Sequence, residues 1–222
     1  RKLLVLPIEL RLALVALFGI GLLVLGWRLR ARQRVYALSV QGGGIGVLYL
    51  TIYSSFALYH LLPAGLAFGL LVAVTAAAGV LAVLQDARSL AVFGILGGFL
   101  APVLVSTGSN NYIALFTYYA LLDLAILGIA WFKAWRVLNV LGFLFTFGIG
   151  TLWGVNYYVP ENFATTEPFL VLFTAMYLVI PVLFAMRVEP PRLRGFVDST
   201  LMFGTPILAF GLQSRLVGDT KY

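Results

Sequence analysis

Long apolar runs alternate with short polar stretches along the whole chain. About 20 apolar residues cross the hydrocarbon core of a bilayer, and measured with that length the sequence divides into eight segments. Because the connections are short, consecutive segments are expected to run antiparallel. The pattern predicts an all-α polytopic transmembrane helix bundle in a single domain, residues 1–222, with spans at 8–27, 36–59, 63–84, 89–106, 111–132, 136–158, 167–186 and 196–214.

The second of these segments is too polar to face lipid on every side. Residues 36–60 contain four glycines, three serines, four tyrosines and the one histidine of the chain. At 100° per residue, one helix face is small in its inner half and aromatic or polar in its outer half. We therefore expect this helix to lie wedged between others, presenting on that face Gly42, Gly46, Tyr49, Tyr53 and His60.

Pairs of glycines four residues apart occur in several spans. Such pairs allow the backbones of two membrane helices to approach closely. Glycines also recur at similar depths in alternate spans, at Gly42, Gly94, Gly142 and Gly204. Repeated helical hairpins would produce this recurrence, and so would chance similarity among glycine-rich spans. The predicted helix-packing glycines are Gly42, Gly46, Gly94, Gly98, Gly150 and Gly154.

Composition agrees with a lipid solvent and narrows the chemistry. The chain is 62% hydrophobic and 10% charged, whereas soluble domains are about one quarter charged. Cysteine is absent and there is one histidine, which excludes disulfides, thiolate metal sites and multi-histidine metal sites within this chain. The serines have no histidine and acid arranged beside them in the sequence. We expect no metal and no cofactor, and an embedded enzyme ranks third behind the two functional classes described below.

The net charge of +7 is concentrated in alternate loops. Lysine and arginine are enriched on the cytoplasmic side of membrane proteins. The odd-numbered loops hold ten such residues and the even-numbered loops hold none: Arg28, Arg30, Arg32, Arg34, Arg88, Lys133, Arg136, Arg187, Arg192 and Arg194. This predicts cytoplasmic odd loops and two periplasmic chain ends in a bacterial inner membrane. The expected partners are membrane lipids or other membrane-protein subunits, and no nucleic acid.

Asp123 is the charged residue placed nearest to a bilayer midplane. It lies eleven residues from Tyr112, or about 16 Å along a helix. A carboxyl group at that depth has to be neutral or partnered. We predict that spans two, five and six converge on a pocket above it, and that a tyrosine from span two or five donates to it. The candidate pocket residues are Asp123, Tyr119, Tyr49, Tyr53, His60 and Thr146.

Two less specific interpretations accompany this pocket. Asp123 can be a neutral acid that makes one interhelical hydrogen bond and only stabilises packing. His60 can be an ordinary residue of the membrane interface. At the start of the seventh span, Thr165 or Thr166 is a candidate N-cap, with Glu167 in the first turn.

Four stretches of the sequence carry a resemblance that covers nearly the whole chain. They read YALSVQGGGIGVLYLTIYSSFALYHLLPAGLAF, ILGGFLAPVLVSTGSNNYIALFTYYALLDL, LGFLFTFGIGTLWG and GFVDSTLMFGTP. In these words the chain resembles the predicted bacterial multi-pass membrane proteins known as domain of unknown function 2339. The resemblance implies a much longer parent protein, of which residues 1–222 would be an internal segment. It also implies that asparagine is common at the position of Asp123, which favours packing over a proton path.

Two functional classes follow from these observations. The first is a transport-like or small-ligand or lipid-binding membrane subunit, which requires a cavity open to the outside. The second is a structural or assembly component of a membrane complex, which requires a filled interior and an apolar face for a partner.

Overall fold

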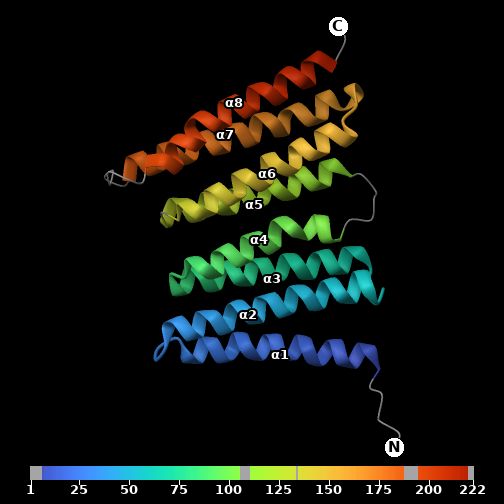
Figure 1. The fold of residues 1–222 in the computed structure, drawn as a ribbon, viewed down its shortest axis with the longest axis vertical. Helices are drawn as coiled ribbons and strands as arrows, with labels where there is room; N and C mark the ends of the chain where they lie inside the picture. Colours follow the sequence, from blue (N-terminus) through green and yellow to red (C-terminus); the bar gives the residue numbers. More distant parts are fainter. Residues whose placement is uncertain (1–6, 106–110, 134, 188–194, 220–222) are drawn as a thin grey trace, which may run out of the picture. The chain divides into compact units, whose positions relative to one another are not determined.

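A computed structural model describes residues 7–105, 111–133, 135–187 and 195–219. The described residues form eight α-helices and no β-strand (Figure 1). The predicted all-α class is confirmed, as is the division into eight helical segments. The helices are α1 (Ile8–Leu29), α2 (Arg34–Tyr53), α3 (Ala64–Gln85), α4 (Arg88–Leu104), α5 (Tyr112–Phe132), α6 (Arg136–Tyr157), α7 (Phe163–Arg187) and α8 (Gly195–Asp219).

Six of the helices, α1, α2, α3, α5, α6 and α7, are long and apolar enough to cross a membrane. Helix α4 has 17 residues, or about 26 Å at 1.5 Å per residue, slightly less than a bilayer core of about 30 Å. Helix α8 has 25 residues but includes Thr205, Gln213 and Arg215. The fold is therefore a membrane helix bundle in which α4 is short and α8 is more polar.

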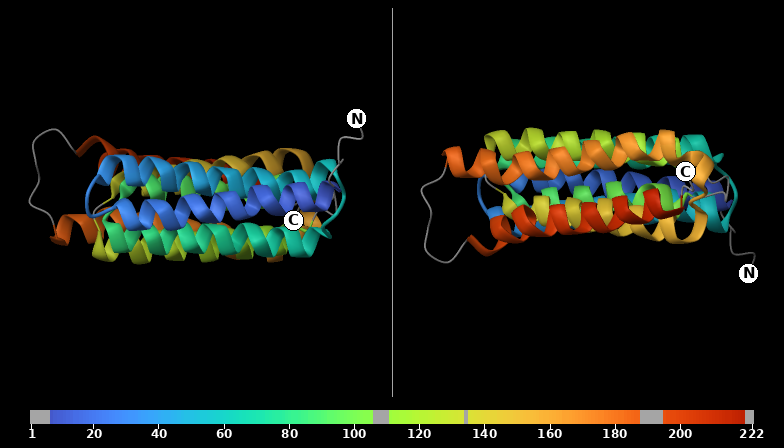
Figure 2. Two further views of the ribbon diagram at one scale, coloured as in Figure 1. Left: turned by 90° about the horizontal axis from the view of Figure 1, so that it is seen from below. Right: turned by 90° about the horizontal axis from the view of Figure 1, so that it is seen from above.

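The chain divides into two compact units, residues 1–108 and residues 109–222. In unit 1, α2 packs against α1, α3 and α4; in unit 2, α5 packs against α6 and α7, and α8 packs against α6 and α7. Within each unit the successive helices are antiparallel (Figure 2). The single domain and the repeated hairpins remain predictions.

Glycines let α1 and α2 approach closely in unit 1. A Cβ atom on Gly44 would lie 2.8 Å from the carbonyl oxygen of Gly19, and one on Gly26 would lie 2.7 Å from that of Ala37. These distances leave no room for a side chain. On the face predicted to pack, Gly42 lies against Phe93, whereas a Cβ on Gly46 would meet nothing within 4 Å.

Tyr49 ties α2 to both α3 and α4. Its hydroxyl oxygen lies 2.7 Å from Oγ1 of Thr75 and donates to the carbonyl oxygen of Gly94 at 3.3 Å. The aromatic ring occupies the space that a side chain at Gly97 would need. At Gly94, a Cβ would lie 2.9 Å from that of Ala78, as expected of a helix-packing glycine, and Gly98 is buried.

The far end of α2 widens into a π-helical turn, Ser54–Leu58. Such turns insert an extra residue into the helix. His60 follows with a φ angle of 50° and is exposed, while Tyr53 is half-buried. Both predicted pocket residues therefore lie near the end of α2 rather than in its core.

Helix α7 begins earlier than predicted. A short 3₁₀ turn, Pro160–Asn162, leads directly into the helix at Phe163, and Pro168 lies inside it. The expectation that Thr165 or Thr166 caps the helix is therefore wrong, because both lie within the first turn. Thr165 donates to the carbonyl oxygen of Asn162 at 2.9 Å, and Thr166 is buried.

Candidate functional site

Asp123 lies in the interior of unit 2 and is 2% exposed. Both of its carboxyl oxygens accept a hydrogen bond. The Tyr177 hydroxyl donates to Oδ1 at 2.6 Å, and the Thr146 hydroxyl donates to Oδ2 at 2.8 Å. A midplane carboxyl group is costly without such partners, so these two bonds explain how α5 tolerates the residue.

The tyrosine that donates to Asp123 comes from α7, whereas we expected one from the second or fifth span. The hydroxyl of Tyr49 is bonded within unit 1. Depth along the helix could have made Tyr177 a candidate. It lies ten residues from the end of α7 at Arg187 and Asp123 lies nine from the end of α5 at Phe132, about 15 and 14 Å.

Gly142 makes room for this hydrogen bond. A Cβ on Gly142 would collide with the Tyr177 hydroxyl and with Cδ1 of Ile126, and would lie 3.3 Å from Oδ1 of Asp123. Only glycine at this position of α6 leaves space for the phenol to reach the carboxyl group. Asp123, Thr146 and Tyr177, together with Gly142, form what we call the Asp123 cluster.

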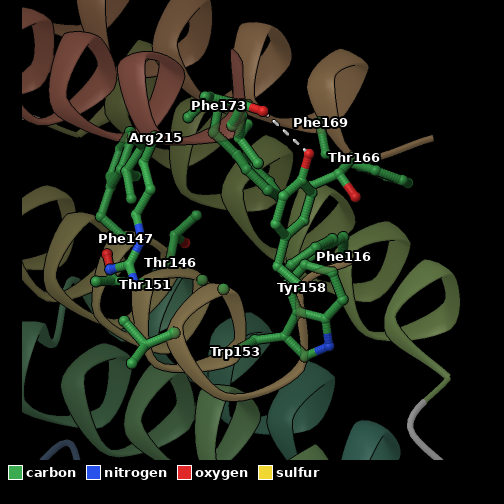
Figure 3. Close-up of a pocket in the computed structure, with 16 residues that line it drawn as sticks. Phe116, Thr146, Phe147, Thr151, Trp153, Tyr158, Thr166, Phe169, Phe173 and Arg215 are labelled. Carbon is green, nitrogen blue, oxygen red and sulfur yellow. Dashed lines mark hydrogen bonds between the residues drawn. The ribbon is translucent and has the colours of Figure 1, made fainter. Parts of the chain in front are cut away.

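A cavity lies next to the Asp123 cluster, because Thr146 belongs to the cluster and also lines the cavity. Figure 3 shows the lining residues. The cavity extends from Thr146 to Tyr158 at the end of α6, which is the end of unit 2 where α6 connects to α7. We call that end the mouth. The cavity is lined by Phe116 from α5; by Thr146, Phe147, Gly150, Thr151, Trp153, Gly154 and Val155 from α6; by Tyr158; by Thr166, Phe169, Leu170 and Phe173 from α7; and by Leu212, Arg215 and Leu216 from α8.

Most of this lining is apolar and much of it is aromatic. The rings of Phe116 and Trp153 lie edge to face with centroids 5.2 Å apart, and Phe169 lies 5.6 Å from Phe116. The Tyr158 hydroxyl donates to the carbonyl oxygen of Leu216 at 3.2 Å (Figure 3), which joins the mouth to α8. These contacts hold the wall in place without filling the cavity.

Gly150 and Gly154 line the cavity. A Cβ on either residue would meet nothing within 4 Å. We expected these glycines to bring two helices together, but the space beside them is open. Their missing side chains enlarge the cavity instead.

The cavity volume is about 80 Å³. A water molecule needs roughly 10–15 Å³ on this scale, so the space accommodates about five to eight groups of that size. An aromatic ring or a short run of methylene groups fits it. A complete lipid does not, and would have to leave its remainder outside.

The remaining predicted pocket residues do not line this cavity. Tyr119 is fully buried in α5. Tyr49, Tyr53 and His60 belong to unit 1, so their convergence with the fifth and sixth spans remains a prediction. Among the described residues, no group of three or more histidine, cysteine, aspartate or glutamate side chains is arranged to hold a metal ion.

Comparison with known families places the chain. The sequence model of one protein family, the predicted membrane proteins termed domain of unknown function 2339, matches residues 2–222. The chain belongs to this family. No curated protein and no solved structure shows significant similarity to it.

The fold described above agrees with the family description of a predicted membrane protein, because it is a helix bundle with several candidate membrane spans. The family description assigns no reaction and no ligand. The cavity and the Asp123 cluster are therefore the features of this member from which a function can be inferred.

Proposed function

We propose that this chain is an inner-membrane subunit that binds a small amphiphile or a lipid chain in the cavity of unit 2. The observation that carries the proposal is an aromatic-lined cavity between four helices that ends at Thr146. Ligand sites are typically concave and mostly apolar, with a few fixed polar groups that orient the ligand. The cavity of unit 2 has both properties.

The deep end of the cavity carries a hydrogen-bond acceptor. The hydroxyl hydrogen of Thr146 is directed at Oδ2 of Asp123, so what this oxygen offers to a ligand is its lone pairs. Asp123 thereby acts as a positioning residue that orients Thr146. A ligand group that reaches this end should bear a donor, such as a hydroxyl group or a carried water molecule.

The charge pattern supports an orientation with the mouth toward the periplasm. Lys133 follows α5 and Arg136 begins α6, at the opposite end of unit 2 from the mouth. Glu161 follows α6 at the mouth and Glu167 lies in the first turns of α7. Because basic loops favour the cytoplasm, a ligand would enter from the outer leaflet or the periplasm. This is the orientation of a transport-like subunit that accepts its ligand outside.

The alternative function is assembly of a membrane complex. That function was expected to accompany a filled interior, whereas the cavity beside Thr146 is open. The exposed apolar residues of α1, including Leu17 and Phe18, are satisfied by lipid contact. The open cavity therefore favours ligand binding, with membrane lipids as the first partners to test.

Trp153 provides a direct test because it lines the cavity. Replacing Trp27, Trp131 and Trp135 with phenylalanine leaves Trp153 as the sole tryptophan, which can be excited selectively over the tyrosines. In vesicles of phosphatidylcholine and phosphatidylglycerol that both carry brominated chains, a chain inside the cavity should quench its emission strongly.

A matched pair of variants distinguishes the cavity from the surrounding bilayer. Gly150→Leu fills the cavity and should relieve the quenching. Gly148 lies two residues away on the same helix and is exposed, and a Cβ there would meet nothing within 4 Å. Gly148→Leu should therefore leave the quenching unchanged. Equal quenching in the parent and both variants, or no quenching at all, would show that no chain occupies the cavity.

A further inference from the structure

The mouth of the cavity carries polar side chains in an otherwise apolar lining. Arg215 from α8, Thr166 from α7 and Thr151 from α6 all line the cavity. Arg215 lies four residues from the end of α8 and Thr166 three residues from the start of α7, or about 6 and 5 Å from the helix ends. Both therefore lie at headgroup depth, level with Trp153 and Phe116, while Phe147 and Phe173 lie deeper.

Thr166 is 7% exposed, and its hydroxyl has no hydrogen-bond partner among the described residues. Leaving a buried hydroxyl without a partner is unfavourable. In the first turn of α7 an alanine or valine would pack without that penalty. Thr166 lines the cavity, so a rotation of its side chain toward the cavity would let a ligand accept a hydrogen bond from this hydroxyl.

Arg215 supplies a positive charge on the other side of the mouth. Its side chain extends from α8 toward the side of the cavity formed by α6, where Thr151 lies (Figure 3). A guanidinium group presents a planar fork of donors that matches phosphate and carboxylate groups. Of the polar side chains that line the cavity at this end, Arg215 is a cation and Thr151 and Thr166 carry hydroxyl donors, whereas Glu161 and Glu167 lie near the mouth but do not line the cavity.

We propose that the mouth is a binding site for the headgroup of an anionic phospholipid. The phosphate group binds Arg215, a neighbouring ester or hydroxyl oxygen accepts from Thr166, and the start of one acyl chain enters the aromatic cavity. The shared chemistry is an anionic group attached to an apolar chain. This inference rests on the proposed function and specifies its ligand class.

The test uses the protein with Trp153 as its sole tryptophan, in mixed vesicles where only one lipid is brominated at a time. Brominated phosphatidylglycerol should occupy the site about fivefold better than brominated phosphatidylcholine. That factor corresponds to roughly 1 kcal/mol for one arginine facing an anionic lipid.

Arg215→Gln should abolish the preference between the two lipids, and Arg215→Lys should retain part of it. Arg11→Gln is the matched control. Arg11 lies three residues from the start of α1, is exposed, and is predicted to face the same side of the membrane. This variant should leave the preference unchanged.

Thr166→Val separates a ligand-binding role from a structural one. Valine has nearly the same shape and removes the unpartnered hydroxyl, so the protein should become no less stable to thermal unfolding. Its occupancy by brominated phosphatidylglycerol should nevertheless fall. A loss of stability without a change in this occupancy would contradict the assignment of Thr166.

The outcomes also distinguish this inference from the proposed function. If both lipids quench Trp153 equally, and Gly150→Leu still relieves the quenching, the headgroup site is overturned and the binding of a chain in the cavity stands. Displacement of brominated phosphatidylglycerol by inorganic phosphate alone would assign the mouth to a free anion and overturn the lipid. Displacement by a soluble alkyl phosphate but not by inorganic phosphate would support an anionic amphiphile and place its source in solution.

Discussion

Each of the two units contains a tyrosine that occupies the space left by a glycine, the half-buried Tyr49 in unit 1 and the buried Tyr177 in unit 2. In unit 1 the ring of Tyr49 lies where a side chain on Gly97 would be, and its hydroxyl meets Thr75 and the Gly94 carbonyl. In unit 2 the hydroxyl of Tyr177 lies where a side chain on Gly142 would be. The tyrosine of unit 1 meets neutral groups, whereas that of unit 2 meets a carboxyl group.

The two tyrosines differ in how much hydrogen-bonding capacity remains at the groups that they contact. The Tyr49 hydroxyl has one hydrogen to donate and gains a second contact at Thr75, so its ordinary capacity is largely used. A carboxylate offers about four acceptor positions, and Asp123 receives donors from Tyr177 and Thr146. Thr146 then faces the cavity. The two tyrosine–glycine contacts therefore have different consequences. In unit 2 the carboxyl group of Asp123 links the contact, through Thr146, to the cavity.

Gly142→Ala should have the largest effect on this comparison. The new methyl group displaces the Tyr177 hydroxyl and deprives Asp123 of a donor. Overpacking combined with loss of a hydrogen bond to an acidic group predicts a loss of about 3–5 kcal/mol in the free energy of unfolding in detergent. Gly148→Ala on the same helix, where a Cβ meets nothing within 4 Å, should cause no loss. Equal stability of the two variants would contradict the arrangement of the Asp123 cluster.

Gly97→Ala should be less damaging, because the clash in unit 1 affects neutral groups. We expect a loss of about 1–3 kcal/mol from overpacking, measured by the same unfolding assay. Gly79→Ala is the control, since a Cβ there also meets nothing within 4 Å. Adding Tyr49→Leu should recover part of the loss by removing the ring. If Gly97→Ala costs more than Gly142→Ala, the carboxyl group is not what distinguishes the two units.

Tyr177→Phe and Tyr49→Phe compare the two hydroxyl groups directly. Interhelical hydrogen bonds in membrane proteins contribute about 0.6 kcal/mol on average and at most about 1.7 kcal/mol. We expect Tyr177→Phe to cost close to the upper value and Tyr49→Phe close to the average. Unfolding of the two variants in the same detergent measures the difference, and the reverse order would refute the distinction.

Asp123→Asn should have the smallest effect. An asparagine oxygen can still accept from Tyr177, and the Thr146 hydroxyl can rotate to accept from the amide group. The expected loss is under about 1 kcal/mol, with a small fall in the quenching of Trp153 by brominated lipid, because the rotated Thr146 no longer presents the same lone pairs to the cavity. A large loss of lipid binding in this variant would indicate a charge-dependent role for Asp123.

Hydropathy was sufficient to predict the helices and the class of fold. It located all eight helical segments, because each apolar run has about the length that crosses the hydrocarbon core of a bilayer. Asp123 is buried in unit 2 and accepts a hydrogen bond from Thr146, and both residues were candidates from their positions along their own helices. Those inferences depend only on distances along one helix.

The neighbours of each helix were harder to predict. Tyr177 was overlooked because hydropathy does not indicate that α7 packs beside α5. Glycine spacing was ambiguous for a similar reason. Gly94 lies against Ala78, while Gly150, which has the same spacing motif, opens onto a cavity. Whether a glycine brings helices together or leaves a space depends on the side chains opposite, which its own sequence motif does not contain.

The spacing of the partners of Asp123 along the chain has a consequence for biosynthesis. Thr146 follows Asp123 by 23 residues and Tyr177 follows it by 54. At about 5–20 residues per second, the ribosome needs roughly 3–11 seconds after Asp123 to add Tyr177. During that interval α5 carries its carboxyl group without the second donor. Release of α5 into lipid is therefore expected to wait for α7, and unit 2 should enter the bilayer as a group of helices.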